Sequence, residues 1–253
     1  MKYFRINILL AAVIVIGVIL QSSFEPDKKK KAPKESIQAN VNANGTILEF
    51  MLVAGKEHNH PTFAFWIENL DGTFVQELFV TKSLSTGIYG HGQKVEGVWD
   101  TEPGEVRRPA TLPYFLHKRG VKAEDGTYLP TPKKPIVDAY TGATPAADFD
   151  LEAKSNEKLS GKYRILFELN QSWDWNEFWN NTKHIDELNY KTSCQPALVY
   201  SVVIDFDNPM DYYALNPMGH SHYSGKTGEL FTDISTLTTA KHIFDKIEVR
   251  VKK

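Results

Sequence analysis

The chain has 253 residues, 42% of them hydrophobic and 12% aromatic, so it can bury a sizeable core in one large or two small domains. Its formal net charge of −2 gives no electrostatic case for binding nucleic acid or an anionic membrane surface. Cys194 is the one cysteine, which excludes an intramolecular disulfide. No histidine is close to Cys194 in the sequence, so we expect a small buried hydrophobe rather than a nucleophile.

Residues 1–23 have the pattern of a signal peptide or a membrane anchor. Lys2 and Arg5 precede an apolar run, Ile8–Leu20, which is shorter than the roughly 20 residues of a membrane-spanning helix. No cysteine follows this run, which excludes a lipoprotein anchor. We therefore expect an exported protein of the periplasm or cell envelope, tethered to the inner membrane if the segment is not cleaved.

Residues 24–45 are predicted to form a disordered linker. The stretch Asp27–Lys34 is rich in charge and lacks any apolar periodicity. The folded part is then expected to span residues 46–253, as a β-sandwich domain with a C-terminal extension.

Three strands are predicted in the first part of this domain. Residues 46–53 and 62–68 are rich in apolar side chains, and the second stretch is dense in aromatic rings. Asn69–Gly72 contains an Asp-Gly turn, after which residues 73–81 return as a third strand, so we expect a hairpin. The following residues, 87–135, are rich in glycine and proline and are expected to be mainly loop, with an apolar patch at 112–116.

A motif of small and hydroxyl residues, Asp138–Thr144, follows this loop. Its sequence Asp-Ala-Tyr-Thr-Gly-Ala-Thr resembles the pattern Asp-x-x-Ser/Thr-Gly-Ala-Thr, at which a flavin transferase attaches FMN to a threonine of extracytoplasmic electron-transfer proteins. The resemblance implies that Thr144 is the acceptor. The other cofactor-site residues that it implies are Asp138, Thr141, Gly142 and Ala143.

The residue types of this motif suit that chemistry. A hydroxyl must attack a phosphoryl centre while a transferase holds it in line, so the acceptor is a serine or threonine. Gly142 and Ala143 leave room for another protein's backbone, and Gly142 can adopt the positive φ of a tight turn. Asp138 is expected to position the loop or to interact with the transferase's metal. The alternative is an ordinary Thr-Gly turn without a cofactor.

The remaining elements are strands with little helix between them. Residues 161–169, 197–206 and 246–251 are predicted strands, whereas 173–181 is expected to contain a turn or two of helix and 237–246 a short helix. Several strands joined by long, turn-rich connections favour a mostly β fold of the β-sandwich type, with one or two short helices.

Four segments together resemble the predicted periplasmic domain-of-unknown-function family 2271, namely residues 63–81, 108–113, 138–145 and 161–163. The resemblance covers roughly residues 46–170 and implies an immunoglobulin-like β-sandwich. It also implies a flavin transferase and a membrane redox protein of the PepSY type as partners. It implies no established activity.

Two further clusters have both a functional and a structural interpretation. His220 and His222, two residues apart, would face the same side of a strand and could share a metal, but two ligands do not complete a site. Hydrogen-bonded histidines in a Gly-rich loop are the alternative. The indoles of Trp173–Trp179 could stack on an isoalloxazine ring or a sugar, or could cover an edge of the sandwich.

Three functions remain open from the sequence. The first is an electron carrier of the cell envelope with FMN covalently attached at Thr144. The second is a non-enzymatic immunoglobulin-like binding or structural module of the periplasm, and the third is a metal-binding envelope protein that uses His220 and His222. The sequence contains no Gly-x-Ser-x-Gly elbow and no His-Glu-x-x-His pair, which favours a carrier or binding protein over a stand-alone enzyme.

Overall fold

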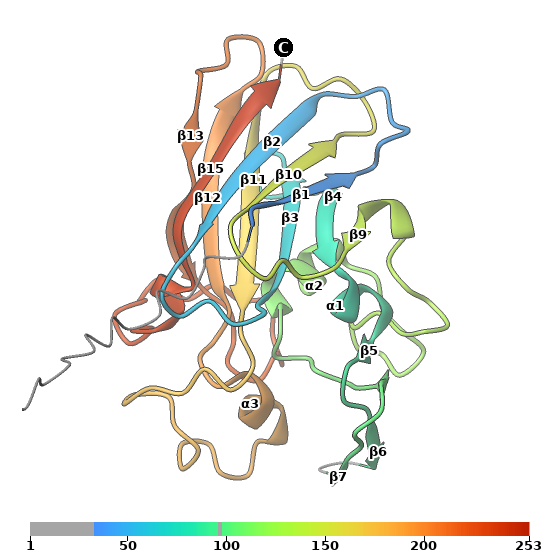
Figure 1. The fold of residues 1–253 in the computed structure, drawn as a ribbon, viewed down its shortest axis with the longest axis vertical. Coiled ribbons are helices and arrows are strands. Elements are labelled where there is room, and N and C mark those ends of the chain that lie inside the picture. The colour runs from blue at the N-terminus through green and yellow to red at the C-terminus, as the bar shows by residue number, and fades with distance from the viewer. Residues whose placement is uncertain (1–32, 96–97, 253) are drawn as a thin grey trace, which may run out of the picture. The chain divides into compact units, whose positions relative to one another are not determined.

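The strands expected from the sequence are present in the computed structural model, which describes residues 33–95 and 98–252 (Figure 1). The prediction of a mostly β fold is confirmed. The strands that match the expected ranges closely are β2 (Ile47–Ala54), β3 (Thr62–Glu68), β4 (Phe74–Thr81), β11 (Lys162–Asn170), β12 (Leu198–Asp205) and β15 (Phe244–Lys252). The predicted signal peptide or anchor, 1–23, and residues 24–32 of the predicted linker lie outside the described residues. Within the described ranges, no helix is long and apolar enough to cross a membrane.

The hairpin of β3 and β4 forms at the predicted Asp-Gly turn. Gly72 has a φ of 86°, in the left-handed region that glycine adopts without steric cost. The N–H of Gly72 donates to the carbonyl of Asn69 at 3.0 Å, and the N–H of Asn69 donates to the carbonyl of Thr73 at 2.9 Å. The turn thereby fixes a register that places Phe65 opposite Phe79.

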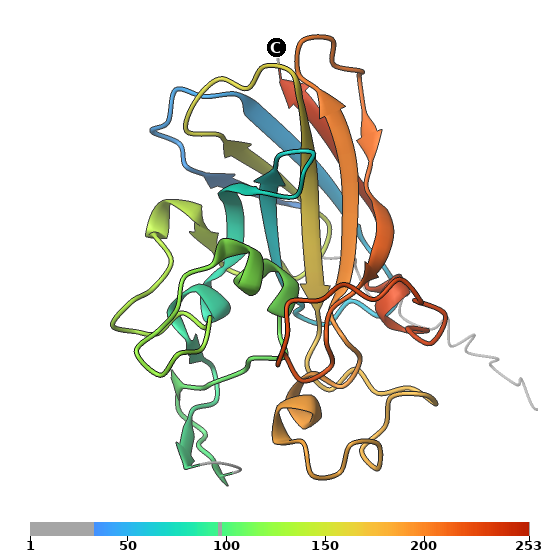
Figure 2. The same ribbon diagram turned by 180° about the vertical axis from the view of Figure 1, so that it is seen from behind.

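Within the described residues, the strands form two large sheets (Figures 1 and 2). The five-stranded sheet has the order β1 (Glu35–Ala39), β10 (Phe149–Lys154), β2, β15 and β13 (Tyr213–Ala214). The six-stranded sheet has the order β14 (Asn216–His220), β12, β11, β3, β4 and β9 (Thr141–Gly142). Neighbouring strands are antiparallel except at two edges, where β1 runs parallel to β10 and β9 runs parallel to β4.

Short elements connect the strands of the two sheets. Two small ribbons pair β5 (Ile88–Tyr89) with β8 (Gly104–Glu105) and β6 (Gln93–Val95) with β7 (Val98–Trp99). The helical elements of the described residues are α1 (Lys82–Thr86), α2 (Pro113–Arg119), η1 (Asp138–Tyr140), α3 (Leu188–Ser193) and η2 (Ala240–His242).

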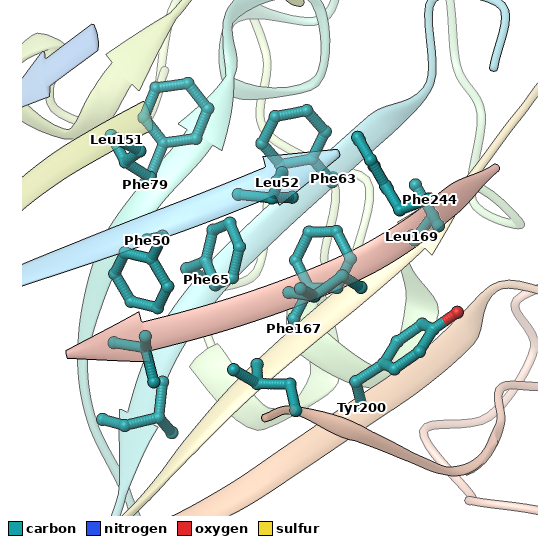
Figure 3. Close-up of a cluster of buried hydrophobic side chains, with 14 of the residues drawn as sticks. Phe50, Leu52, Phe63, Phe65, Phe79, Leu151, Phe167, Leu169, Tyr200 and Phe244 are labelled. Carbon is teal, nitrogen blue, oxygen red and sulfur yellow. The ribbon is translucent and has the colours of Figure 1, made fainter. Parts of the chain in front are cut away.

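The core between the sheets is dense in phenylalanine rings from both of them (Figure 3). The ring centroids of Phe50 on β2 and Phe65 on β3 are 4.2 Å apart. Those of Phe63 on β3 and Phe149 on β10 are 5.5 Å apart. All four side chains are fully buried, so burial of aromatic surface holds the two sheets together.

Part of the outer face of the six-stranded sheet is also buried, under α2 and the loops around it (Figure 2). Trp66 of β3 points to this side and packs against Phe115 of α2, with ring centroids 5.3 Å apart. Leu166 of β11 joins the same cluster. β3 and the second half of β11 are therefore buried on both faces, which explains the unbroken apolar run Phe63–Ile67 of β3.

Glu168 of β11 fastens α2 to this outer face. Its Oε1 and Oε2 accept the backbone N–H groups of Tyr114 and Phe115 at 3.2 and 2.6 Å. Both groups belong to the first turn of α2, where N–H groups have no partner within the helix. Burial raises the pKa of Glu168 to about 8, although hydrogen bonds from the two N–H groups and from Ser221 favour the ionised form.

The predicted start of the folded domain at residue 46 is wrong. β1 lies inside residues 24–45, which were expected to be a disordered linker, and it pairs with β10 so that Ile37 is opposite Leu151. Ala39 is buried and Ile37 packs against the core. Ile37 and Ala39 are the only apolar side chains of this strand. The charged and polar residues around them make the apolar–polar alternation of a strand hard to detect in the sequence.

The predicted helices are also only partly correct. Residues 173–181 form turns and bends rather than a helix. The prediction at 237–246 reduces to the single turn of η2. A real helix, α2, lies inside the range 87–135 that was expected to be mainly loop, and its buried residues are the apolar patch noted at 112–116.

We expect Glu168 to contribute to the pH dependence of stability. Its folded-state pKa of about 8 lies above the ordinary value of 4.5, so between these values the folded state holds a proton that the unfolded state releases. The resulting contribution to the free energy of unfolding is complete below about pH 4.5 and is lost as the pH rises toward about 8. Urea unfolding across this window should show the wild type losing stability relative to Glu168→Gln.

Glu124→Gln, at an exposed position, is the matched control and should follow the wild type. Parallel curves for the wild type and Glu168→Gln across this pH window would contradict the assignment.

Candidate functional site

The motif Asp138–Thr144 lies at one edge of the six-stranded sheet (Figure 1). Its first residues form η1, and β9 then pairs in parallel with the end of β4, with Thr141 opposite Val80 and Gly142 opposite Thr81. β9 is the last strand of this sheet in the described part of the chain. The motif therefore lies at a sheet edge, where the N–H of Asn40, just after β1, donates to the carbonyl of Ala139 at 2.6 Å.

Hydrogen bonds fix the backbone on both sides of Thr144. The Thr141 hydroxyl donates to the carbonyl of Asp138 at 3.2 Å and to its Oδ1 at 3.0 Å. Beyond Thr144, the N–H of Ala146 donates to Oε1 of Glu35 on β1 at 2.7 Å. Asp138 and Thr141 thus set the conformation of the motif itself.

Gly142 is small for a reason that the sequence did not indicate. It is an extended strand residue, so the expected positive φ of a tight turn is wrong. A Cβ atom at this position would lie 2.7 Å from Cε2 of Phe79 and 3.6 Å from Cγ2 of Ile37. Phe79 is fully buried, so the close approach of β9 to the core requires glycine here.

Thr144 follows this packed position without entering the core. Ala143 is exposed, Thr144 is half-buried, and Pro145 is buried again. Among the described residues, no group forms a hydrogen bond with the Thr144 hydroxyl. The Thr144 side-chain oxygen therefore has no hydrogen-bond partner in the described structure. It lies next to the exposed Ala143, between two segments that are held by hydrogen bonds.

The segment Trp173–Trp179 divides into exposed and buried aromatic side chains. Trp173 and Phe178 are 56% and 45% exposed, whereas Trp179 is 8% exposed. The Nε1–H of Trp179 donates to the Thr236 hydroxyl at 3.0 Å, and Lys183 Nζ lies 4.0 Å from a ring centroid of the same indole. Only part of this segment is thus available to a ligand or partner.

A cavity of about 410 Å³ lies beside Trp173, and sequence reasoning did not identify it. Asp174 lines it, and its Oδ1 accepts the Thr239 hydroxyl at 2.5 Å. Burial raises the pKa of Asp174 to about 6, although this hydrogen bond opposes the shift. In the sequence, the only sign of this cavity is Asp174 within the aromatic segment Trp173–Trp179. That sign does not indicate which distant residues complete the lining.

His220 and His222 have contacts that give each a structural role. Nδ1 of His220 lies 2.8 Å from the carbonyl of Ser221, and its ring stacks on Phe231 with centroids 5.4 Å apart. The His222 ring stacks on Tyr223 at 4.5 Å, and its Nδ1 accepts the N–H of Ser224 at 3.2 Å. The described residues contain no group of three or more His, Cys, Asp or Glu placed to hold a metal ion.

Comparisons with known proteins add no assignment to these observations. A scan against protein-family models found no match. The searches of curated proteins and of solved structures also found none. The resemblance to the domain family 2271 stays a prediction from the sequence.

Substitution of Gly142 should reveal how tightly the motif is packed. Gly142→Ala places a methyl group 2.7 Å from the buried Phe79 ring, so we expect a loss of roughly 1–3 kcal/mol in the free energy of unfolding. Gly90→Ala is the matched control, because a Cβ there meets no heavy atom within 4 Å. Urea denaturation of both variants measures the difference, and equal stabilities would refute the packing argument.

Proposed function

We propose that this protein is an exported electron carrier of the cell envelope, with FMN covalently attached at Thr144. The observation that carries the proposal is Thr144 itself, a half-buried residue next to the exposed Ala143, whose hydroxyl has no hydrogen-bond partner among the other described residues. A threonine in the core would be out of reach of a transferase. The match of Asp138–Thr144 to the FMN-attachment pattern supplies the cofactor class.

The attachment chemistry assigns a defined role to each residue of the motif. The Thr144 oxygen would form a phosphoester bond to a flavin dinucleotide donor, with its proton passing to a base of the transferase. The pyrophosphate bond of the donor breaks, and a nucleoside monophosphate leaves. Asp138 and Thr141 hold the loop, and Ala143 leaves the approach to the hydroxyl open. Once attached, FMN would supply the redox chemistry, because its isoalloxazine ring is not part of the ester.

The partners and location belong to the same proposal. A flavin transferase would modify Thr144, and a membrane redox protein of the PepSY type would exchange electrons with the carrier, as the family resemblance implies. Both would meet it in the periplasm, where the predicted N-terminal signal peptide or anchor would deliver it. We also propose that the fold is an immunoglobulin-like β-sandwich. The packing of phenylalanine rings between two sheets supports this fold class.

Co-expression with a flavin transferase tests the attachment directly. We expect the tryptic peptide that contains Thr144 to gain the mass of one FMN less one water, and the protein to gain visible flavin absorbance. Thr144→Ala should abolish both signals, whereas Thr144→Ser keeps a hydroxyl and should retain them.

Thr101→Ala removes an exposed hydroxyl elsewhere and is the matched control, which should remain fully modified. An unmodified wild-type peptide, or modification that persists in Thr144→Ala, would exclude this function.

A second candidate is a binding module that uses the exposed aromatic side chains of the Trp173–Trp179 segment. The observation that favours it is the exposure of Trp173 and Phe178 on neighbouring turns, since buried Trp179 alone would make a purely structural segment. Two measurements distinguish the two candidates. The binding module predicts unmodified Thr144 in protein from the native host, together with loss of partner binding in Trp173→Ala.

A further inference from the structure

Arg108 is a half-buried arginine with two aromatic neighbours. Its guanidinium carbon lies 4.3 Å from the ring centroid of Tyr89 on β5 and 5.4 Å from that of Trp99 on β7. Both separations are within the range of cation–π attraction, which holds the guanidinium in place without neutralising it.

No carboxylate of the described residues forms an ion pair with Arg108. Two other described arginines are paired: Arg107 Nη2 lies 2.6 Å from Asp125, and Arg119 Nε lies 3.6 Å from Glu77. Burial lowers the pKa of the Arg108 guanidinium, because a cation removed from water without a counter-ion is destabilised. The Nε–H of Arg108 is also buried without a partner in the described structure.

The hydrogen bonds of Arg108 leave donors available on one side of the group. Nη1 donates to Ser172 Oγ at 2.8 Å, across 64 residues of sequence. Ser172 accepts this bond, so its own O–H is left to donate, and no described residue accepts from Arg108 Nη2. Arg108 Nη2 and the Ser172 hydroxyl, which are linked through Nη1, therefore remain as donors for an oxyanion such as a carboxylate or phosphate.

The surroundings of Ser172 add independent signs of a binding site. Trp173 follows it with a φ of 65°, a left-handed conformation that is strained for a bulky residue and tends to occur at functional sites. Ser172 and Trp173 both line the cavity of about 410 Å³, together with Lys56 and Asn59, and Arg108 is joined to this lining by its hydrogen bond to Ser172 rather than lining the cavity itself. Glu57 and Asp174 also line it, so the cavity offers both donors and acceptors to the rest of a ligand.

We propose that Arg108 and Ser172 bind the oxyanion, a carboxylate or a phosphate, of a small ligand whose remaining part extends over Trp173. The oxyanion would replace the missing counter-ion of Arg108, so binding would recover the cost of desolvating that cation. Arginine suits this role because its planar fork binds two oxygens at once and stacks on aromatic rings. The site is independent of Thr144 and of any flavin attached there.

Calorimetric titration of the folded protein with inorganic phosphate and with benzoate tests the proposal at constant ionic strength. We expect saturable binding of at least one of them, and the one that binds identifies the ligand class. Arg108→Lys keeps the charge but loses the fork and the stacking, so it should weaken binding by about tenfold or more. Ser172→Ala should weaken binding by several-fold.

Arg250→Lys is the matched control, because Arg250 is ion-paired with Glu49 on the five-stranded sheet, and its titration should equal that of the wild type. Melting curves establish that each variant is folded. If Arg108→Lys does not fold, Ser172→Ala decides the question alone, since it removes one half-buried hydroxyl. The proposal is overturned if neither anion binds saturably to the wild type, or if the folded Arg108 and Ser172 variants bind as well as the wild type does.

Discussion

Burial of β3 and the second half of β11 on both faces is the constraint on which the rest of the fold depends. Phenylalanine rings of these strands fill the space between the sheets, while Trp66 and Leu166 need a second cover on the outside. α2 supplies this cover, and Glu168 anchors it by accepting the first N–H groups of the helix. A carboxyl in so apolar a place is tolerated because these N–H groups would otherwise be unsatisfied.

Because packed side chains fill the interior, both candidate sites lie at strand edges or strand ends. The Thr144 motif extends from β9, the last strand at one edge of the six-stranded sheet. Its glycine serves the fold, through contact with Phe79, and its threonine is the position left free. One short motif therefore joins a tightly packed glycine to a half-buried threonine whose hydroxyl has no hydrogen-bond partner among the described residues.

The loops at the ends of the strands bring together groups from distant parts of the chain. Ser172 follows β11 and Arg108 follows β8, and their hydrogen bond places an unpaired cation beside a strained, exposed tryptophan. Arg108 is held by aromatic rings rather than by a carboxylate, so its charge is not cancelled within the described structure. The exposed ring of Trp173 and the charge of Arg108 are thus close together outside the packed core, so that neither interrupts the packing between the sheets.

The sequence by itself determined the main strands, the hairpin at Gly72 and the burial of Cys194, because periodicity and turn chemistry are local properties. It did not reveal β1, whose two apolar residues become a strand only beside β10, nor α2, which is held by Glu168 of a distant strand. It also misjudged Gly142, whose size is set by Phe79 rather than by a turn. Tertiary structure alone decided these features, since each depends on atoms that are far apart along the chain and meet only when both sheets have formed.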